Sequence, residues 1–259
     1  MQKNFGKSRE EFEAILEHLP DAEREGFRRM GEMFKPWETL HPELALYLYE
    51  DHMGTHLKHP LVFDVMYCPG LRDGMLNEQY EAKSKAVAEY RAEGKWSSFV
   101  FMHERPYRLD ALMKIQDEIE DDCEFWDLVS GVWTDTENAR QNYEEWDDLF
   151  SSERSCRESM MNDAEREVLA GLPKEFVIHR GFRFKEDEYD GIEGFSWSLD
   201  YERAVWFAKR FAGPFGDVPQ VATAKVHKHD VIAYLDGRGE DEIVVLPEDV
   251  IVIERKEVA

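Results

Sequence analysis

Cysteine is scarce in this sequence, and long apolar runs are missing. The 259 residues hold three cysteines, Cys68, Cys123 and Cys156, and no two of them form a C-x-x-C pair. Their odd number and scattered positions predict neither a disulfide framework nor a cysteine zinc site. No run approaches the roughly 18 apolar residues of a membrane span, and no apolar signal segment precedes the first charged helix. We therefore expect a cytoplasmic protein with no membrane partner.

Positive charge is also in short supply. Lys and Arg number 32 against 56 Asp and Glu, which sets the formal net charge at -24. Such a charge repels polyanions, so passive binding to nucleic acid or anionic lipid is excluded as a general function. One local basic cleft could still engage a nucleic acid. The apolar content of 42%, with 13% aromatics, is that of a globular protein and not of a disordered one.

Residues 1–165 are predicted to form a helical region. Ser8 and Glu11 make a capping box, and the apolar face that follows ends at Pro20. The segment 122–133 is apolar over too broad a face for a surface helix, which favours a central position. We expect this region to recognise a target or to regulate the site, and to pack on the domain that follows.

Three histidines in the helical region lie at i, i+4 and i+7, so on a helix His52, His56 and His59 would share one face. A zinc site needs such a convergence of imidazoles. Gly54 and Pro60 weaken a helix here, however, and no H-E-x-x-H pattern accompanies the histidines. We therefore predict no metal.

Residues 166–259 are predicted to form a strand-rich domain. Glycine, proline and aspartate separate its short β-branched runs, which are residues 176–180, 221–226, 231–235, 243–246 and 250–253. One amphipathic helix, residues 200–211, interrupts the runs. Strands and helices do not alternate and no G-x-G-x-x-G is present, which excludes a Rossmann domain. The expected fold class is α+β, with the helical region packed on a small mixed or antiparallel sheet.

Three motifs follow one another in this domain. They are an Arg-Gly pair at 180–181 after a predicted strand, a Ser-Trp-Ser stretch at 196–198 before the helix, and a Glu-Asp-Glu stretch at 240–242 after a glycine-rich turn. In order and spacing they resemble the Arg, Ser-x-Ser and Glu-x-Glu signature of the toxin-like mono-ADP-ribosyltransferases. The resemblance covers about residues 165–259. It implies an ADP-ribosyltransferase-like catalytic domain with NAD as its substrate and no metal.

The chemistry of NAD cleavage accounts for the residue types in these motifs. Breaking the nicotinamide–ribose bond passes through an oxocarbenium-like state, which a preorganised carboxylate stabilises. The resemblance assigns this role to Glu242, with Ser196 holding its carboxylate. Glu240, on the same face of an extended strand, would accept a proton from the acceptor. A guanidinium matches phosphate oxygens, which assigns Arg180 to the pyrophosphate of NAD.

Further residues complete the predicted NAD site. Gly181 would let the backbone approach the ligand closely. By the resemblance, Trp197 and Ser198 would support the nicotinamide ribose. Phe215, in the loop after the helix, would stack on the nicotinamide, although a plain Gly/Pro turn explains that loop equally well. His179 is included as the neighbour of the arginine, although a packing role also explains it.

The acceptor is less defined than the donor. Glu-x-Glu is the pattern of arginine-specific relatives, but their aromatic residue three positions earlier is replaced here by Gly237. The macromolecular acceptor is therefore a protein arginine or an RNA or DNA base, and Arg238 would suit a phosphate. Small relatives of this kind act as intracellular toxins, defence effectors or phage modifiers, whose partner would be a neutralising antitoxin or inhibitor protein. Two alternatives stay open: an NAD glycohydrolase, and an acidic binding or inhibitor protein that keeps the fold as a scaffold.

Overall fold

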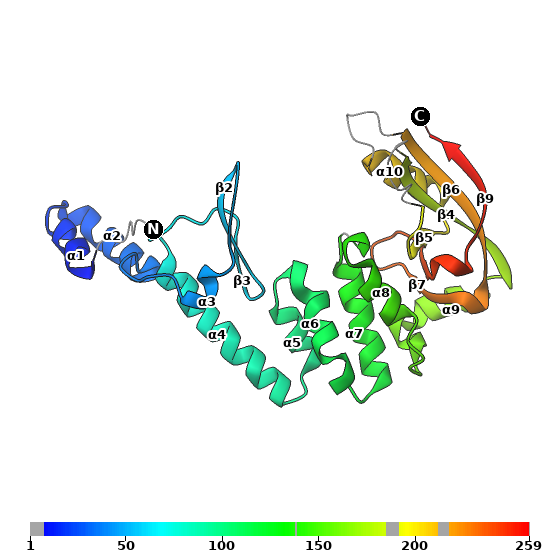
Figure 1. The fold of residues 1–259 in the computed structure, drawn as a ribbon, viewed down its shortest axis with the longest axis horizontal. Coiled ribbons are helices and arrows are strands. Elements are labelled where there is room, and N and C mark those ends of the chain that lie inside the picture. Colours follow the sequence, from blue (N-terminus) through cyan, green and yellow to red (C-terminus); the bar gives the residue numbers. More distant parts are fainter. Residues whose placement is uncertain (1–7, 138, 185–191, 212–217, 259) are drawn as a thin grey trace. The chain divides into compact units, whose positions relative to one another are not determined.

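The computed structural model describes residues 8–137, 139–184, 192–211 and 218–258. The chain divides into two compact units, Met1–Ile115 and Gln116–Ala259 (Figure 1). The sequence predicted a change of character between residues 165 and 166, and the first strand of the larger sheet begins soon afterwards, at Glu175. The compact unit that contains this sheet begins earlier, because the helices that follow Gln116 belong to it.

The N-terminal unit (residues 8–115) combines helices with a small sheet. Its helices are α1 (Arg9–Glu17), α2 (Asp21–Phe34), α3 (Pro42–Ala45), α4 (Asp73–Ala92), α5 (Trp96–Met102), α6 (Arg108–Ile115) and the 3-10 turn η1 (Arg105–Tyr107). The predicted capping box is confirmed. Ser8 Oγ accepts the N–H of Glu11 at 3.2 Å, and the Glu11 carboxylate accepts the N–H of Ser8 at 2.9 Å.

The expectation that the first 165 residues are helical fails between residues 48 and 64. Strands β1 (Leu48–Asp51), β2 (Gly54–His59) and β3 (Val62–Asp64) form an antiparallel sheet in the order β1–β2–β3. Asp51 pairs with Gly54, and Gly54 has a φ of 127°, a conformation that favours glycine. The glycine that weakened the helix prediction therefore starts the second strand of a tight hairpin.

The histidines at positions 52, 56 and 59 consequently share no helical face. His56 Nε2 contacts Asp51 Oδ1 at 2.9 Å across the hairpin. His59 is buried, and its Nδ1 accepts the N–H of Leu61 at 3.0 Å. Local hydrogen bonds therefore account for His56 and His59. No group of three or more His, Cys, Asp or Glu that could hold a metal ion occurs within the described residues.

The C-terminal unit (residues 116–258) is built on a six-stranded antiparallel sheet in the order β7–β8–β5–β4–β6–β9. Its strands are β4 (Glu175–Phe184), β5 (Ser196–Ser198), β6 (Val218–His227), β7 (Val231–Leu235), β8 (Glu242–Val245) and β9 (Ile251–Glu257). Its helices are α7 (Asp122–Asp135), α8 (Tyr143–Phe150), α9 (Asp163–Gly171), α10 (Tyr201–Phe211) and the short η2 (Gln116–Glu118), η3 (Ala139–Asn142), η4 (Arg157–Met160), η5 (Lys228–Asp230) and η6 (Pro247–Asp249). The α+β class is confirmed, with an antiparallel sheet.

Helix α7 is central to this unit, as its sequence predicted. Six of its side chains are buried: Phe125, Trp126, Leu128, Val129, Val132 and Trp133. The indole of Trp133 packs edge-on against Phe150 of α8 and against Phe195, which directly precedes β5. An aromatic cluster therefore joins α7 and α8 to the part of the sheet that carries the Ser-Trp-Ser motif.

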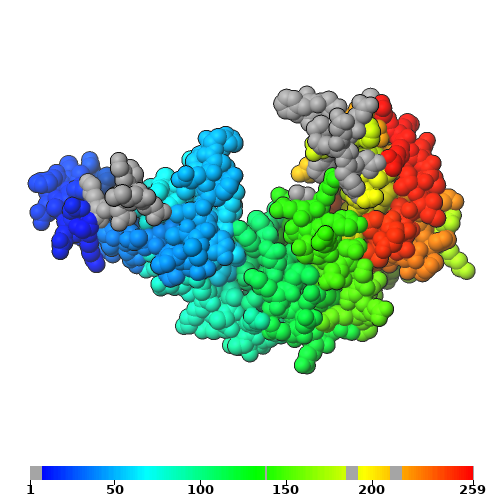
Figure 2. Space-filling view, in the orientation of Figure 1, coloured from blue at the N-terminus to red at the C-terminus, as the bar shows by residue number. Residues whose placement is uncertain are grey.

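Strand β9 lies at one edge of the large sheet and is exposed along its whole length (red in Figure 2). Its second half is charged, from Glu254 to Glu257. Charged side chains on an edge strand oppose pairing with the edge of another chain. Among the helices that the structure describes, none has the length and apolar character needed to cross a membrane.

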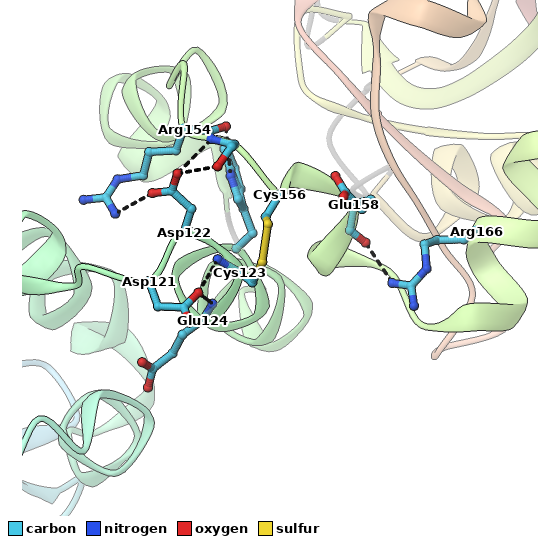
Figure 3. Close-up of a disulfide and its surroundings, with 10 residues drawn as sticks. Asp121, Asp122, Cys123, Glu124, Arg154, Cys156, Glu158 and Arg166 are labelled. Atoms are coloured by element: carbon cyan, nitrogen blue, oxygen red, sulfur yellow. Dashed lines mark hydrogen bonds and ion pairs between the residues drawn. A yellow bond between two sulfur atoms is a disulfide. The ribbon is translucent and has the colours of Figure 1, made fainter.

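A disulfide joins Cys123 of α7 to Cys156, the residue before η4 (Figure 3). The sequence predicted no disulfide framework, and the scattered positions of the cysteines gave no sign of this single pairing. The two residues are 33 positions apart, and the packing of α7 on η4 brings their Cα atoms to 5.0 Å. Stable disulfides are characteristic of oxidising compartments. The cytoplasmic location therefore stays a prediction.

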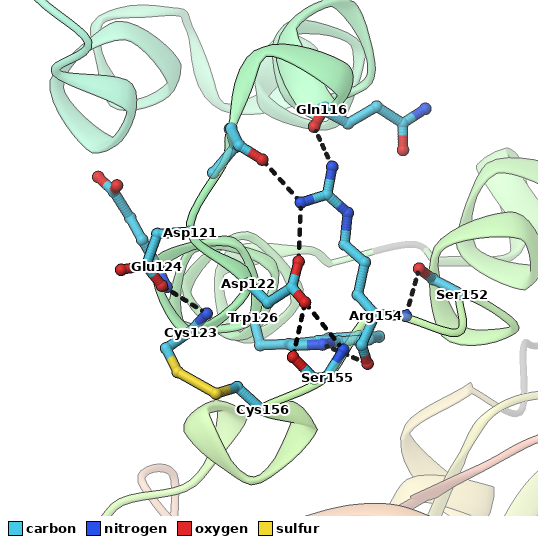
Figure 4. A network of polar contacts seen from close by, with 11 residues as sticks. Gln116, Asp121, Asp122, Cys123, Glu124, Trp126, Ser152, Arg154, Ser155 and Cys156 are labelled. Atoms are coloured by element: carbon cyan, nitrogen blue, oxygen red, sulfur yellow. Dashed lines mark hydrogen bonds and ion pairs between the residues drawn. A yellow bond between two sulfur atoms is a disulfide. The ribbon is translucent and has the colours of Figure 1, made fainter.

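A polar network surrounds the disulfide and fixes the start of α7 (Figure 4). Asp122 Oδ2 accepts the N–H and the hydroxyl of Ser155 at 3.0 and 2.7 Å. Arg154 donates to the carbonyls of Gln116 and Ile119, both at 2.7 Å. These bonds tie the segment before α7 to the segment after α8, so the position of α7 does not depend on the disulfide alone.

Candidate functional site

Strands β5 and β8 are neighbours and carry two of the three motifs. Ser198 of β5 pairs with Glu242, the first residue of β8. Because side chains alternate along a strand, Ser196 and Ser198 lie on one face and Trp197 on the other. Trp197 is buried, and its Nε1 donates to the carbonyl of Gly194 at 3.1 Å. The tryptophan therefore packs in the core. The prediction had assigned it to the nicotinamide ribose.

Glu242 is a buried carboxylate, with 3% of its surface exposed. Its Oε1 accepts the indole N–H of Trp133 at 3.2 Å, and its Oε2 lies 3.0 Å from Nη2 of Arg238. The Ser196 hydroxyl lies near enough to this carboxylate to lower its pKa. Burial raises the pKa of Glu242, while the Ser196 hydroxyl and the charge of Arg238 oppose that shift. Glu242 and these three partners, Ser196, Trp133 and Arg238, are called the Glu242 site below.

Arg180 lies on β4, beside the Glu242 site. Its Nη1 donates to the carbonyl of Ser196, and the charge of Glu242 acts on it. Burial lowers the pKa of Arg180 to about 10, so it stays protonated at neutral pH. A Cβ on Gly194 would lie 2.4 Å from Arg180 Nη2, so any other residue there would displace this guanidinium. The structure thus brings Arg180, Ser196 and Glu242 together.

Glu240 reaches the site by a different route from the one predicted. Strand β8 begins only at Glu242, and Asp241 has a φ of 45°, so strand alternation does not apply here. Glu240 and Glu242 meet because Nη2 of Arg238 contacts Glu240 Oε2 at 2.9 Å as well as Glu242. The turn is held by Ser198, whose hydroxyl donates to the carbonyl of Glu240 at 2.8 Å.

Ser198 is therefore an anchor of the loop and not an open hydroxyl. Besides its bond to Glu240, its oxygen accepts the N–H of Asp200 at 3.0 Å, just before α10. The side chain joins the turn before β8 to the start of α10. Both hydrogen bonds involve backbone groups, so the serine orients the loop that carries Glu240.

Gly181 and His179 have packing roles in the structure. A Cβ on Gly181 would lie 1.9 Å from the carbonyl oxygen of Ala204, in the backbone of α10. The close approach that the glycine permits is therefore that of helix to strand. His179 is half-buried, contacts Thr223 Oγ1 through Nδ1 at 3.1 Å and packs edge-on against Tyr201. Burial lowers the pKa of this imidazole. Phe215 lies outside the described residues.

Trp133 is the site residue that the sequence prediction missed. It comes from α7, 109 residues before Glu242, and had been interpreted only as core. The one available signal was a polar indole N–H on the broad apolar face of this helix, because a buried Trp needs an acceptor for its N–H. That signal identifies the need for an acceptor and does not identify Glu242.

A small cavity of about 80 Å³ adjoins the site. Glu242, Arg238, Glu165 and Leu235 are among the residues that line it. Both oxygens of Glu165 are bonded to backbone, to the N–H of Asp236 at 2.8 Å and that of Asn162 at 2.9 Å. Small-molecule sites usually measure several hundred cubic ångströms. The cavity as it stands is therefore too small for a nucleotide, and Arg238 lies against the carboxylate.

The chemical capacity of the site follows from its charges. A buried carboxylate that is held by two hydrogen-bond donors, Trp133 and Arg238, is positioned to stabilise a developing positive charge. An adjacent arginine offers a fork that suits a phosphate or carboxylate. No protein-family model matches this chain, and neither does any curated protein or solved structure.

Proposed function

We propose that the chain is a mono-ADP-ribosyltransferase that transfers ADP-ribose from NAD to a macromolecular acceptor. The observation that carries the proposal is the Glu242 site, in which a buried carboxylate accepts a hydrogen bond from Trp133, lies beside Ser196 and interacts with the charge of Arg180. Burying an ionisable carboxylate costs several kcal/mol, so a position of this kind is a candidate for chemistry.

In the proposed reaction, Glu242 faces the ribose of NAD and stabilises the oxocarbenium-like state that forms as nicotinamide leaves. Its burial strengthens that interaction, because the low local dielectric screens the charges little. Arg180 binds a phosphate of the substrate. Glu240, at the mouth of the loop, takes the proton that the acceptor loses. Gln could fill the structural role of Glu242 but could not supply its charge.

The test is the release of nicotinamide from NAD by the purified chain. We expect Glu242-dependent release, together with an ADP-ribosyl group on a protein or on RNA in a cell extract, identified by mass spectrometry of the two fractions. Release without labelling of either fraction would make water the acceptor, as in an NAD glycohydrolase. If the chain neither binds NAD nor releases nicotinamide, the proposal is wrong and the acidic binding protein becomes the better hypothesis.

Trp133 is expected to act as a positioning residue for Glu242. Phenylalanine at this position keeps the aromatic packing and removes the N–H donor. A hydrogen bond to a charged group is worth about 1.5–3 kcal/mol, so we expect nicotinamide release to fall at least about tenfold in Trp133→Phe. The same change should raise the pKa of Glu242, because the Trp133 bond lowers it.

Trp126→Phe is the matched control for Trp133→Phe. Trp126 is buried on the same helix, and its Nε1 donates to the carbonyl of Arg154 at 3.4 Å, away from Glu242. We expect Trp126→Phe to affect stability without shifting the acid limb of the pH–rate profile, which is the fall in rate toward low pH. If the acid limb shifts equally in the two variants, Trp133 has no specific role in positioning Glu242.

The pH profile of the reaction should show the raised pKa of Glu242. The reaction needs the carboxylate ionised, so the rate should fall as the pH drops through the pKa in the folded protein. Because burial raises that pKa, the acid limb is expected above about 4.3, the ordinary value for Glu. The folded chain also binds this proton more tightly than the unfolded chain, so the contribution of Glu242 to stability is largest at low pH and declines as pH rises. An acid limb at or below the ordinary value would contradict this assignment.

A further inference from the structure

Arg238 occupies the place between the two glutamates. Its Nη2 lies 2.9 Å from Glu240 Oε2 and 3.0 Å from Glu242 Oε2, and its Nη1 donates to the carbonyl of Thr134 at 3.0 Å. The chain therefore already holds a guanidinium against both carboxylates. An external acceptor would have to replace it there.

The two ends of this contact differ in their surroundings. The Glu242 side chain is almost fully buried, at 4% exposure, whereas that of Arg238 is 37% exposed. The glycines on either side of Arg238 are not packed, since a Cβ on Gly237 or Gly239 would meet nothing within 4 Å. Gly239 also has a φ of 64°, which favours glycine. The carboxylate is thus buried, and the arginine is half-exposed on a loop with open space beside its two glycines.

We propose that Arg238 is an ADP-ribosylation site of the chain itself. The inference rests on the proposed function and names a guanidinium, already in place, as the first acceptor. Once the ribose of NAD takes Glu242, Arg238 keeps its contact with Glu240 and presents a nitrogen to the ribose. Electrostatic pairing with Glu240 holds that nitrogen near the reacting position, which supplies the proximity that an intermolecular acceptor must gain by binding.

The reaction balances without a further reactant. A nitrogen of the Arg238 guanidinium forms a bond to C1′ of the ribose, and the bond from C1′ to the nicotinamide nitrogen breaks. Nicotinamide leaves with the electron pair of that bond. The guanidinium loses one proton, which Glu240 accepts and passes to water. The product carries a diphosphate, which two adjacent carboxylates repel, so the modified side chain leaves the Glu242 site.

The experiment is intact-mass spectrometry and peptide mapping of the full chain after incubation with NAD, with nicotinamide measured in parallel. We expect one ADP-ribosyl group per chain, mapped to Arg238, and a rate constant for its attachment that does not change over a tenfold dilution of the protein. Glu242→Gln should gain no adduct. Arg238→Lys, which keeps a cation for the carboxylates but lacks the guanidinium, should gain none at position 238.

Arg203→Lys is the matched control, because Arg203 contacts the same loop at the carbonyl of Gly239, at 2.6 Å, and does not touch the glutamates. It should be modified like the wild type. Glu242-dependent release of nicotinamide without an adduct at Arg238 overturns this inference and leaves the proposed function standing. Attachment that slows on dilution overturns the claim that the chain modifies itself in cis. A wild-type chain that neither releases nicotinamide nor gains mass overturns the proposed function, and the inference with it.

Discussion

Glu242→Gln is expected to lower nicotinamide release by about 10²–10³-fold, the usual cost of removing one preorganised electrostatic partner of a transition state. The amide oxygen of glutamine can still accept the indole N–H of Trp133, so the shape of the site is kept. What is lost is the negative charge, which acts on Arg180 and Arg238 in the wild type and on the ribose during the proposed reaction. The effect should fall on kcat more than on KM, because the charge acts on the transition state.

The measurement is steady-state release of nicotinamide, with unfolding in urea followed on the same samples. Glu248→Gln is the control, because Glu248 is an exposed carboxylate in η6, just after β8. It should behave like the wild type in both measurements. If folded wild type and folded Glu242→Gln release nicotinamide at the same rate, Glu242 takes no part in the chemistry. The main reason to propose a transferase is then lost.

Local signals in the sequence were sufficient to predict the helices and strands whose formation depends mainly on neighbouring residues. The strand predicted at 231–235 is β7 (Val231–Leu235), and the helix predicted at 200–211 is α10 (Tyr201–Phe211). The strand is a continuous apolar run that ends at Asp236 and Gly237, and the helix has an amphipathic pattern. The sheet at 48–64 was missed because its histidines repeat at intervals that also suit a helix, and two of its strands are only three and four residues long.

The parts of the site that were not predictable depend on contacts between distant residues. Trp133 meets Glu242 across 109 positions, and nothing in either segment identifies the other as its partner. Arg238 was expected to suit a phosphate, and the structure pairs it with Glu240 and Glu242. Spacing identified which carboxylates belong together. It could not show that a cation of the chain itself lies between them.

Gly181→Ala is expected to destabilise the C-terminal unit by about 3 kcal/mol, at the upper end for an overpacked interior. The added Cβ would lie 1.9 Å from the oxygen of Ala204 and 2.6 Å from the nitrogen of Ala208. Both are backbone atoms of α10, and helical backbone cannot move aside as a side chain can. The helix must shift as a body, and it is attached to the site through Ser198, which accepts the N–H of Asp200.

The control for this change is Gly171→Ala, at the end of α9, where a Cβ meets nothing within 4 Å. Urea unfolding should separate the two variants by most of the expected free energy. The sequence assigned Gly181 to the approach of a ligand, and that role predicts a variant of normal stability with weak NAD binding. The contact with α10 predicts that the loss of stability is the primary effect. Any loss of activity would then follow because Ser198 and the loop that carries Glu240 are displaced. If Gly181→Ala is as stable as the wild type, the packing role is wrong and the role in substrate binding becomes the better explanation.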